Sequence, residues 1–160
     1  MEVEIYMLKK PIILLFVCAA AAIPLYPATV SFLVIEAGLP EEYPVSQHSI
    51  MWENGMMDVF FEMGHIVSNS PMMRLDYTPS EGFPDEAEKE LESAKEGGME
   101  YLLIAVVNHP SPHHVSLRLF RTASLEMILE HKYADRNYTT RKEELDAVRE
   151  NVMVLARRIR

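Results

Sequence analysis

The stretch at residues 101–107, YLLIAVV, decides the fold class of this 160-residue chain. A continuous apolar run of this length is typical of a strand buried inside a sheet. It ends at a turn, NHPSP at residues 108–112, after which residues 115–120, VSLRLF, alternate between two sets of side chains. Residues 127–133 form a third strand after another short turn, so this part of the chain predicts an antiparallel meander.

The segment before the meander predicts a strand and a long amphipathic helix. Residues 29–35, TVSFLVI, are rich in β-branched and apolar side chains, which suits a central strand. Ser46 or Ser49 caps a helix that runs to about Met63, with Gly64 as its stop. An apolar arc of about 200° predicts that this helix is buried against a sheet and one further neighbour. Its opposite, polar side is expected to hold Asn54, Gly55, Asp58 and Glu62.

A short strand and two more helices complete the predicted order. The strand spans residues 65–68, and a long loop at residues 69–84 has an extended centre at residues 72–77. Asp85 is expected to cap an acidic helix. The apolar stripe of that helix consists of Ala87, Leu91 and Ala94.

The C-terminal helix begins with a capping box, in which Thr140 and Glu143 have the S/T-x-x-E spacing. Its narrow apolar stripe predicts packing against the sheet and consists of Leu145, Val148, Val152, Leu155 and Ile159. The predicted order is therefore β-α-β-α-β-β-β-α. This order indicates an α+β fold, in which about three helices and a mixed sheet form a two-layer sandwich. Residues 29–160 are expected to form this fold as a single α/β domain.

Composition and charge exclude several classes of protein. The chain has 15 Lys and Arg residues against 24 Asp and Glu residues, which gives a formal charge of −9. A net-negative surface repels phosphate backbones, so nucleic acid is not expected as a partner. The single cysteine excludes a disulfide framework and a cysteine zinc cluster within one chain.

The N-terminal residues 1–22 have the pattern of a secretory signal peptide. Lys9 and Lys10 precede an apolar run at residues 11–23, and small residues follow near Ala22. We favour a cleaved signal, with a retained membrane anchor as the main alternative and a buried core helix as another. Contact with a membrane is therefore expected only through this segment, and the rest of the chain is expected in the periplasm or on the outer face of a bacterial membrane.

Cys18 lies inside this segment and raises the question of a lipoprotein. Lipid modification requires small residues before the cysteine, whereas Phe16 and Val17 are bulky. The preferred interpretation is an apolar residue of the signal, with lipidation as the alternative.

Three histidines, His109, His113 and His114, are the best metal candidates in the chain. They lie at one hairpin end, where imidazoles can converge on an ion, with Glu36 or Asp135 as a possible further ligand. The spacing matches no established metal motif, so an exposed turn is the preferred interpretation. No phosphate-binding motif or nucleophile motif is present, and no cofactor is expected.

The 11 methionines and a few carboxylates form the remaining candidates. Met56, Met57, Met72 and Met73 are candidates for an adaptable partner-binding surface, although core packing is the more common role of methionine. Binding of a soft metal by the thioethers is a third interpretation. Asp58 and Glu62 are expected on a solvated face. Glu53 lies within the apolar arc and, if buried, would need Arg74, Arg118 or Arg121 as a partner.

The order of elements resembles that of small bacterial envelope domains. The features that carry the resemblance are the helix ending in GHIVSN, the step from Ala94 through Gly98 to Tyr101, and the hairpin VSLRLF…SLEMILEHKY. Such domains include the N-terminal domain of the translocation protein TolB and the penicillin-binding-protein activator lipoproteins. The resemblance covers about residues 29–160 and rests on element order.

The resemblance implies an exported, non-enzymatic α/β domain that binds other envelope proteins. The lack of a catalytic constellation and the adaptable methionines favour the same class. The rival class is a small metal-binding or hydrolytic protein built on His109, His113 and His114. A third class is a membrane-tethered structural subunit.

Overall fold

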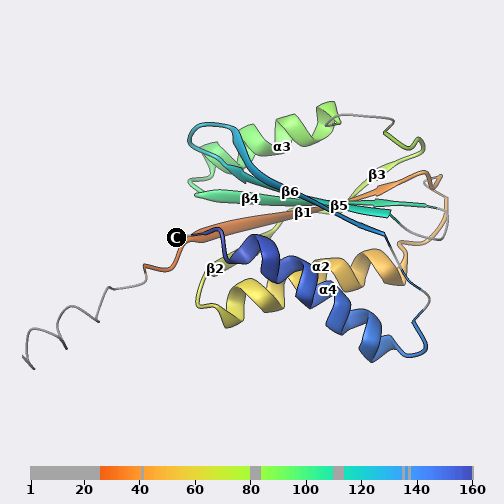
Figure 1. Ribbon diagram of the computed structural model, residues 1–160. Coiled ribbons are helices and arrows are strands. Elements are labelled where there is room, and N and C mark those ends of the chain that lie inside the picture. Colours follow the sequence, from red (N-terminus) through yellow and green to blue (C-terminus); the bar gives the residue numbers. More distant parts are fainter. Residues whose placement is uncertain are drawn as a thin grey trace, which may run out of the picture.

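The computed structural model describes residues 26–40, 42–79, 84–109, 114–134, 136 and 138–159 (Figure 1). The helices among these residues are α2 (Gln47–Glu62), α3 (Asp85–Glu96) and α4 (Arg141–Ala156). The strands are β1 (Thr29–Ala37), β2 (Ile66–Asn69), β3 (Met73–Leu75), β4 (Tyr101–Asn108), β5 (His114–Arg121) and β6 (Glu126–Ala134). The predicted order is confirmed, and the extended centre of the long loop forms one additional short strand, β3.

The strands form one mixed sheet of six strands in the order β2-β1-β4-β5-β6, with β3 also paired to β1. β1 is parallel to β2, β3 and β4, whereas β5 is antiparallel to both of its neighbours, β4 and β6. The predicted C-terminal meander is therefore confirmed. β6 pairs only with β5 among the described strands, so it forms one edge of the sheet.

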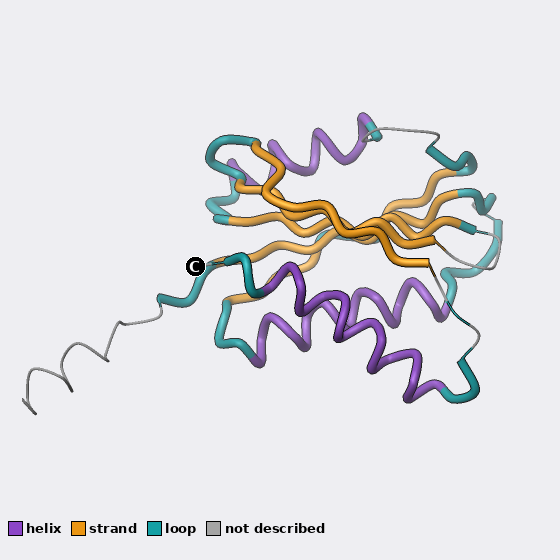
Figure 2. Tube along the Cα trace, viewed as in Figure 1, coloured by secondary structure: helices purple, strands orange, loops and turns teal. Residues whose placement is uncertain are grey.

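Helices lie on both faces of this sheet (Figures 1 and 2). α2 and α4 cover one face side by side, and α3 is the only described helix on the opposite face, so it forms a third layer that the predicted two-layer sandwich did not include. The reason is the apolar run of β4, in which Leu103 and Ala105 face α2 and α4 while Leu102 and Ile104 face α3. A strand that is apolar on both faces requires cover on both faces.

Local capping determines where the helices begin. Of the two predicted caps of α2, Ser46 is the N-cap, and its side chain accepts a hydrogen bond of 3.0 Å from the Ser49 amide. α3 begins one residue away from the expected position, because Pro84 is its N-cap and Asp85 is its first residue. Gly64 follows α2 in the left-handed conformation, as expected, with φ of +84°.

The capping box of α4 differs in one detail from the predicted one. Thr140 Oγ1 accepts a hydrogen bond of 3.2 Å from the Glu143 amide, as expected. The Glu143 carboxylate also accepts a hydrogen bond of 3.0 Å from the amide of Thr139, one residue before the N-cap. Hydrogen bonds to the carboxylate, chiefly those from Thr139, lower the pKa of Glu143, and they outweigh burial, which raises it. The apolar stripe is buried at Val148, Val152, Leu155 and Ile159.

A partly buried chain of hydrogen bonds joins α2 to α4. The indole Nε1 of Trp52 donates to Nε2 of His48 over 3.1 Å. An indole N–H can only donate, so Nε2 of His48 accepts and its Nδ1 carries the ring hydrogen. Nδ1 then donates to the Glu144 carboxylate at 2.6 Å. The histidine therefore has a single tautomer that satisfies partners on both helices.

Gly55 contradicts the prediction that it lies on the polar side of α2. It is buried where α2 crosses α4, and a Cβ atom placed there would be 2.5 Å from Cγ1 of Val148. The helical period placed Gly55 correctly around the axis, but the second helix covers that part of the surface. The residue is a close-approach glycine between two helices.

We therefore expect Gly55→Ala to destabilise the domain by about 1–3 kcal/mol, because Val148 is β-branched and cannot easily turn away. At an exposed helical position the same change would stabilise by roughly 0.5–1 kcal/mol. Urea unfolding at pH 7 measures the difference. The double variant Gly55→Ala/Val148→Ala should lose less unfolding free energy than the sum of the losses in the two single variants, because the shorter side chain at position 148 leaves room for the new Cβ atom. Stabilisation by Gly55→Ala alone would show that the helices do not approach here.

Candidate functional site

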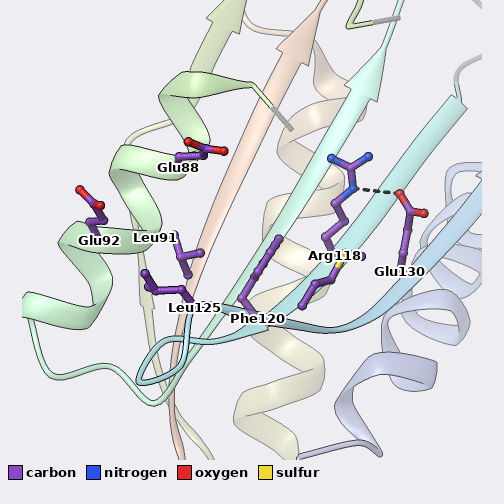
Figure 3. A pocket seen from close by; sticks show the side chains of 8 residues that line it. Glu88, Leu91, Glu92, Arg118, Phe120, Leu125 and Glu130 are labelled. Carbon is purple, nitrogen blue, oxygen red and sulfur yellow. Dashed lines mark hydrogen bonds and ion pairs between the residues drawn. The ribbon is translucent and has the colours of Figure 1, made fainter. Parts of the chain in front are cut away.

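The candidate site is a groove between α3 and the part of β5 and β6 that lies on the same face of the sheet as α3. Its volume is about 490 Å³. α3 contributes Glu88, Leu91 and Glu92 to one wall (Figure 3). The sheet and the β5–β6 turn contribute Arg118, Phe120, Leu125, Met127 and Glu130. The groove exists because α3 packs toward β4 and leaves this part of the face open.

Strand alternation determines which side chains enter the groove. Leu117 and Leu119 of β5 point into the core under α2 and α4, so Arg118 and Phe120 point the other way. In the register with β6, Arg118 lies opposite Glu130, and Phe120 lies opposite Met127. This arrangement agrees with the two sets of side chains predicted for residues 115–120. The sequence alone did not identify the groove, because its walls come from three separate elements.

The floor of the groove is apolar and partly exposed. Leu91 and Phe120 are buried at its base, whereas Leu125 is 40% exposed and Met127 is 47% exposed. Leu125 is also the only non-glycine residue with positive φ in the described part of the chain, at +57°. A side chain in this backbone conformation usually costs about 1 kcal/mol, and glycine or asparagine is the common occupant.

One end of the groove carries a paired charge, and the α3 wall carries unpaired ones. Nε of Arg118 lies 2.9 Å from Oε1 of Glu130, and the Arg118 hydrogen bond is the largest cause of the lowered pKa of Glu130. Lys132 lies 3.6 Å from the other oxygen of Glu130. Glu88 and Glu92 are exposed, and neither forms an ion pair with a described residue. The groove therefore has a negative wall beside an apolar floor.

A second hollow of about 630 Å³ continues along the same face of the sheet. It shares Arg118 and Glu130 with the groove and reaches His114 and Ala134 at the other end of the β5–β6 hairpin. The open face therefore runs along most of these two strands.

The predicted histidine cluster is only partly within the described residues. His109 follows β4, is buried, and donates its backbone N–H to Ala37 O at 2.9 Å. His114 is exposed at the start of β5, whereas His113 and Asp135 lie outside the described residues. Among the residues that are described, no three His, Cys, Asp or Glu side chains are placed to hold a metal. Metal binding by the cluster stays a prediction.

The four candidate methionines differ in accessibility. Met56 is fully buried in the core, so its side chain is not part of the surface. Met57 and Met72 are half-buried against the larger core, and Met73 is half-buried against the smaller one. Contact between these three residues and a partner stays a prediction. Met127, which is not among the four methionine candidates, is the methionine that lines the groove.

The predictions for residues 1–22 and Cys18 lie outside the described residues. Signal cleavage, anchoring and lipidation therefore stay predictions. Among the described helices, none combines the length and the apolar character that a membrane span requires.

The candidate carboxylates of α2 have partners that the sequence did not identify. Glu53 is half-buried and accepts a hydrogen bond of 3.0 Å from Nδ2 of Asn69, so its partner is an amide and not a predicted arginine. Asp58 and Glu62 are exposed, as expected, and both also contact Arg149 of α4. These contacts tie the two helices together at the surface.

Glu36 is the most deeply buried carboxylate that the structure describes. It lies at the C-terminal end of β1 with no exposed surface, and its carboxylate accepts from the Ser46 amide at 2.8 Å. Nε of Arg74 lies 3.1 Å from the other oxygen. Burial raises the pKa of Glu36, but hydrogen bonds from Ser49 and Ser46 and the charge of Arg74 outweigh it and lower the pKa.

The sequence matches no family model and no curated protein. Among solved structures, the chain is similar to lipoprotein GNA1162 from Neisseria meningitidis, with 13% identity over 81% of this chain and 96% of that one and a TM-score of 0.47. It is also similar to the C-terminal domain of LpoB from Escherichia coli, with 11% identity over 73% of this chain and 89% of that one and a TM-score of 0.44.

TolB from Acinetobacter baumannii is a third similar structure, with 7% identity and a TM-score of 0.44. The match covers 82% of this chain but only 28% of TolB. These matches confirm the predicted weak resemblance in element order to domains of the TolB and lipoprotein type. At such low identity the resemblance concerns the fold alone.

Proposed function

We propose that the chain is an exported, non-catalytic domain of the bacterial cell envelope that binds other envelope proteins. The observation that carries the proposal is the open groove beside α3. Exposed Leu125 and Met127 lie there next to buried Phe120, with charged side chains around them. Contiguous exposed apolar surface with a polar rim is typical of protein-interaction sites.

Export is the part of the proposal that rests on the sequence. Lys9 and Lys10 followed by the apolar run at residues 11–23 support a signal peptide. Mass spectrometry of the native N-terminus tests this part. We expect the chain to begin at Ile23, whereas an intact Met1 in the cell interior would contradict export.

The binding part is tested by photo-crosslinking in intact cells. A photoreactive amino acid in place of Met127, in the groove, should form an adduct with a discrete envelope protein. The matched control replaces Val154, which is 43% exposed on α4 on the opposite side of the sheet. We expect no such adduct from position 154 and loss of the position-127 adduct when Leu125 is changed to Asp. Equal adducts from both positions, or none from position 127, would contradict binding through the groove.

A further inference from the structure

We propose that the occupant of the groove is a cationic amphipathic helix of a partner protein, which lies beside α3 across β5 and β6. This inference rests on the proposed function and names the kind of segment that the groove binds. Three separate features of the groove carry it: the space beside α3, the charge of its wall, and the conformation of Leu125.

The space beside α3 lies where one further helix could pack on the sheet. On the opposite face of the sheet, α2 and α4 lie side by side and together cover the core strands (Figure 1). Among the described helices only α3 lies on its face, and the apolar side chains of Phe120 and Met127 continue past it onto β5 and β6. Neighbouring helices pack about 8–10 Å apart, so a second helix placed next to α3 would lie over these strands. An apolar stripe on that helix would cover the exposed part of the floor.

The charge of the groove selects a cationic helix. Glu88 and Glu92 are four residues apart, so both lie on one side of α3, and both line the groove. Neither has a cationic partner among the described residues, whereas Glu130 at one end of the groove is paired with Arg118. Lysine or arginine side chains along one flank of an incoming helix would complement the two unpaired carboxylates. An acidic helix would be repelled by the same wall.

The backbone of Leu125 agrees with a role in binding. Its left-handed conformation favours glycine or asparagine, and its side chain is 40% exposed, so part of its apolar surface remains in contact with water in the chain alone. In contact with a helix, the same side chain would be buried against the apolar stripe of that helix. We therefore expect Leu125 to be a contact residue for the bound helix.

The test uses the full chain and three synthetic peptides labelled with fluorescein, with binding followed by fluorescence anisotropy. The first is a helical peptide with leucines on one face and lysines on the flanks. The second has glutamates in place of the lysines, and the third is an extended peptide with alternating valine and lysine. We expect saturable binding of the first peptide, and at least about tenfold weaker binding of the second at low salt.

Variants of the chain connect this binding to the groove. Leu125→Asn should weaken binding of the lysine peptide about tenfold and leave the melting temperature unchanged or raised. Glu88→Gln/Glu92→Gln should weaken it by a similar factor at low salt, and the difference should disappear at high salt. Asp146→Asn/Glu150→Gln, on exposed positions of α4, removes the same charge and should have no effect.

Each contrary result overturns the inference in a recognisable way. Preference for the extended peptide would indicate strand addition to the β6 edge. A dimer in sedimentation that Leu125→Asn dissociates would indicate a second copy of the chain as occupant. Both results would leave the proposed binding function intact. If none of the peptides binds, the inference about a cationic helix is wrong, but an adduct from position 127 would still support binding through the groove. Equal binding of the lysine and glutamate peptides, or an equal loss in the α4 control, would also contradict the inference.

Discussion

The Leu155→Asp chain is expected to lose about 4 kcal/mol of unfolding free energy, because the change places a charge in the core without a partner. Leu155 has no exposed surface and lies with Val148 and Val152 in the core between α4 and the sheet. Urea unfolding at pH 7 can be followed by the fluorescence of Trp52, which is the single tryptophan and is buried in the same core.

The neighbouring residue offers a matched control for this prediction. Val154 is 43% exposed on the outer side of α4, so Val154→Asp introduces the same charge one residue away without burying it. We expect a change within about 0.5 kcal/mol for this variant. Similar losses for the two variants would show that α4 does not pack on the sheet through the predicted stripe.

Arg74→Met is expected to destabilise the domain by about 3–5 kcal/mol at pH 7, because it leaves the buried charge of Glu36 without its cation. The side chain of Arg74 is 16% exposed and that of Glu36 is 0% exposed, so solvent compensates little for the loss. Arg74 also donates hydrogen bonds to the carbonyl oxygens of Tyr43, at 2.6 Å, and Pro40, at 3.3 Å. The variant therefore also releases the loop that follows β1.

The pH dependence of stability shows whether the loss in the Arg74→Met chain comes from the broken ion pair with Glu36 or from lost packing contacts of Arg74. The pKa of Glu36 is lowered in the folded chain, so its contribution is present above its unfolded pKa and is lost as the pH falls through the folded value. In the Arg74→Met chain the charge of Arg74 is removed, whereas burial and the hydrogen bonds from Ser49 and Ser46 remain, so the pKa of Glu36 rises relative to that in the unchanged chain. The difference in stability between the two chains should therefore shrink as the pH falls from 7 toward about 4.

The control is the double variant Glu36→Gln/Arg74→Met, which removes both charges. It should recover a large part of the loss at pH 7, since an ion pair replaced at both positions costs far less than one that is broken. Urea unfolding between pH 7 and pH 4 measures all three chains. A loss that is the same at every pH, or a double variant no more stable than Arg74→Met, would show that the ion pair does not cause the effect.

Local sequence was sufficient to predict the elements of this fold. The run YLLIAVV became β4, buried on both faces, and the stripe of Ala87, Leu91 and Ala94 became the buried side of α3. Thr140 caps α4 as its spacing predicts. Apolar periodicity and capping depend on residues a few positions apart, so a single sequence contains the information that determines them.

The packing of these elements could not be predicted in the same way. Gly55 belonged to the polar side of α2 by periodicity, yet it is buried because α4 crosses α2 at that point. Glu36 ends an apolar strand, and its partner Arg74 comes from β3, far along the chain. Neither pairing leaves a local pattern in the sequence, because each depends on which surfaces the sheet brings together.

The sequence by itself determined the order of strands and helices and the apolar faces of the helices, and it is the sole basis of the prediction that the first residues direct export. Only the tertiary structure decided that α3 is the one described helix on its face of the sheet and that Glu88, Phe120 and Met127 share one groove. The physical reason is the range of the interactions. Side-chain periodicity acts within one element, whereas the groove exists only where the register of β5 with β6 and the position of α3 bring three elements together.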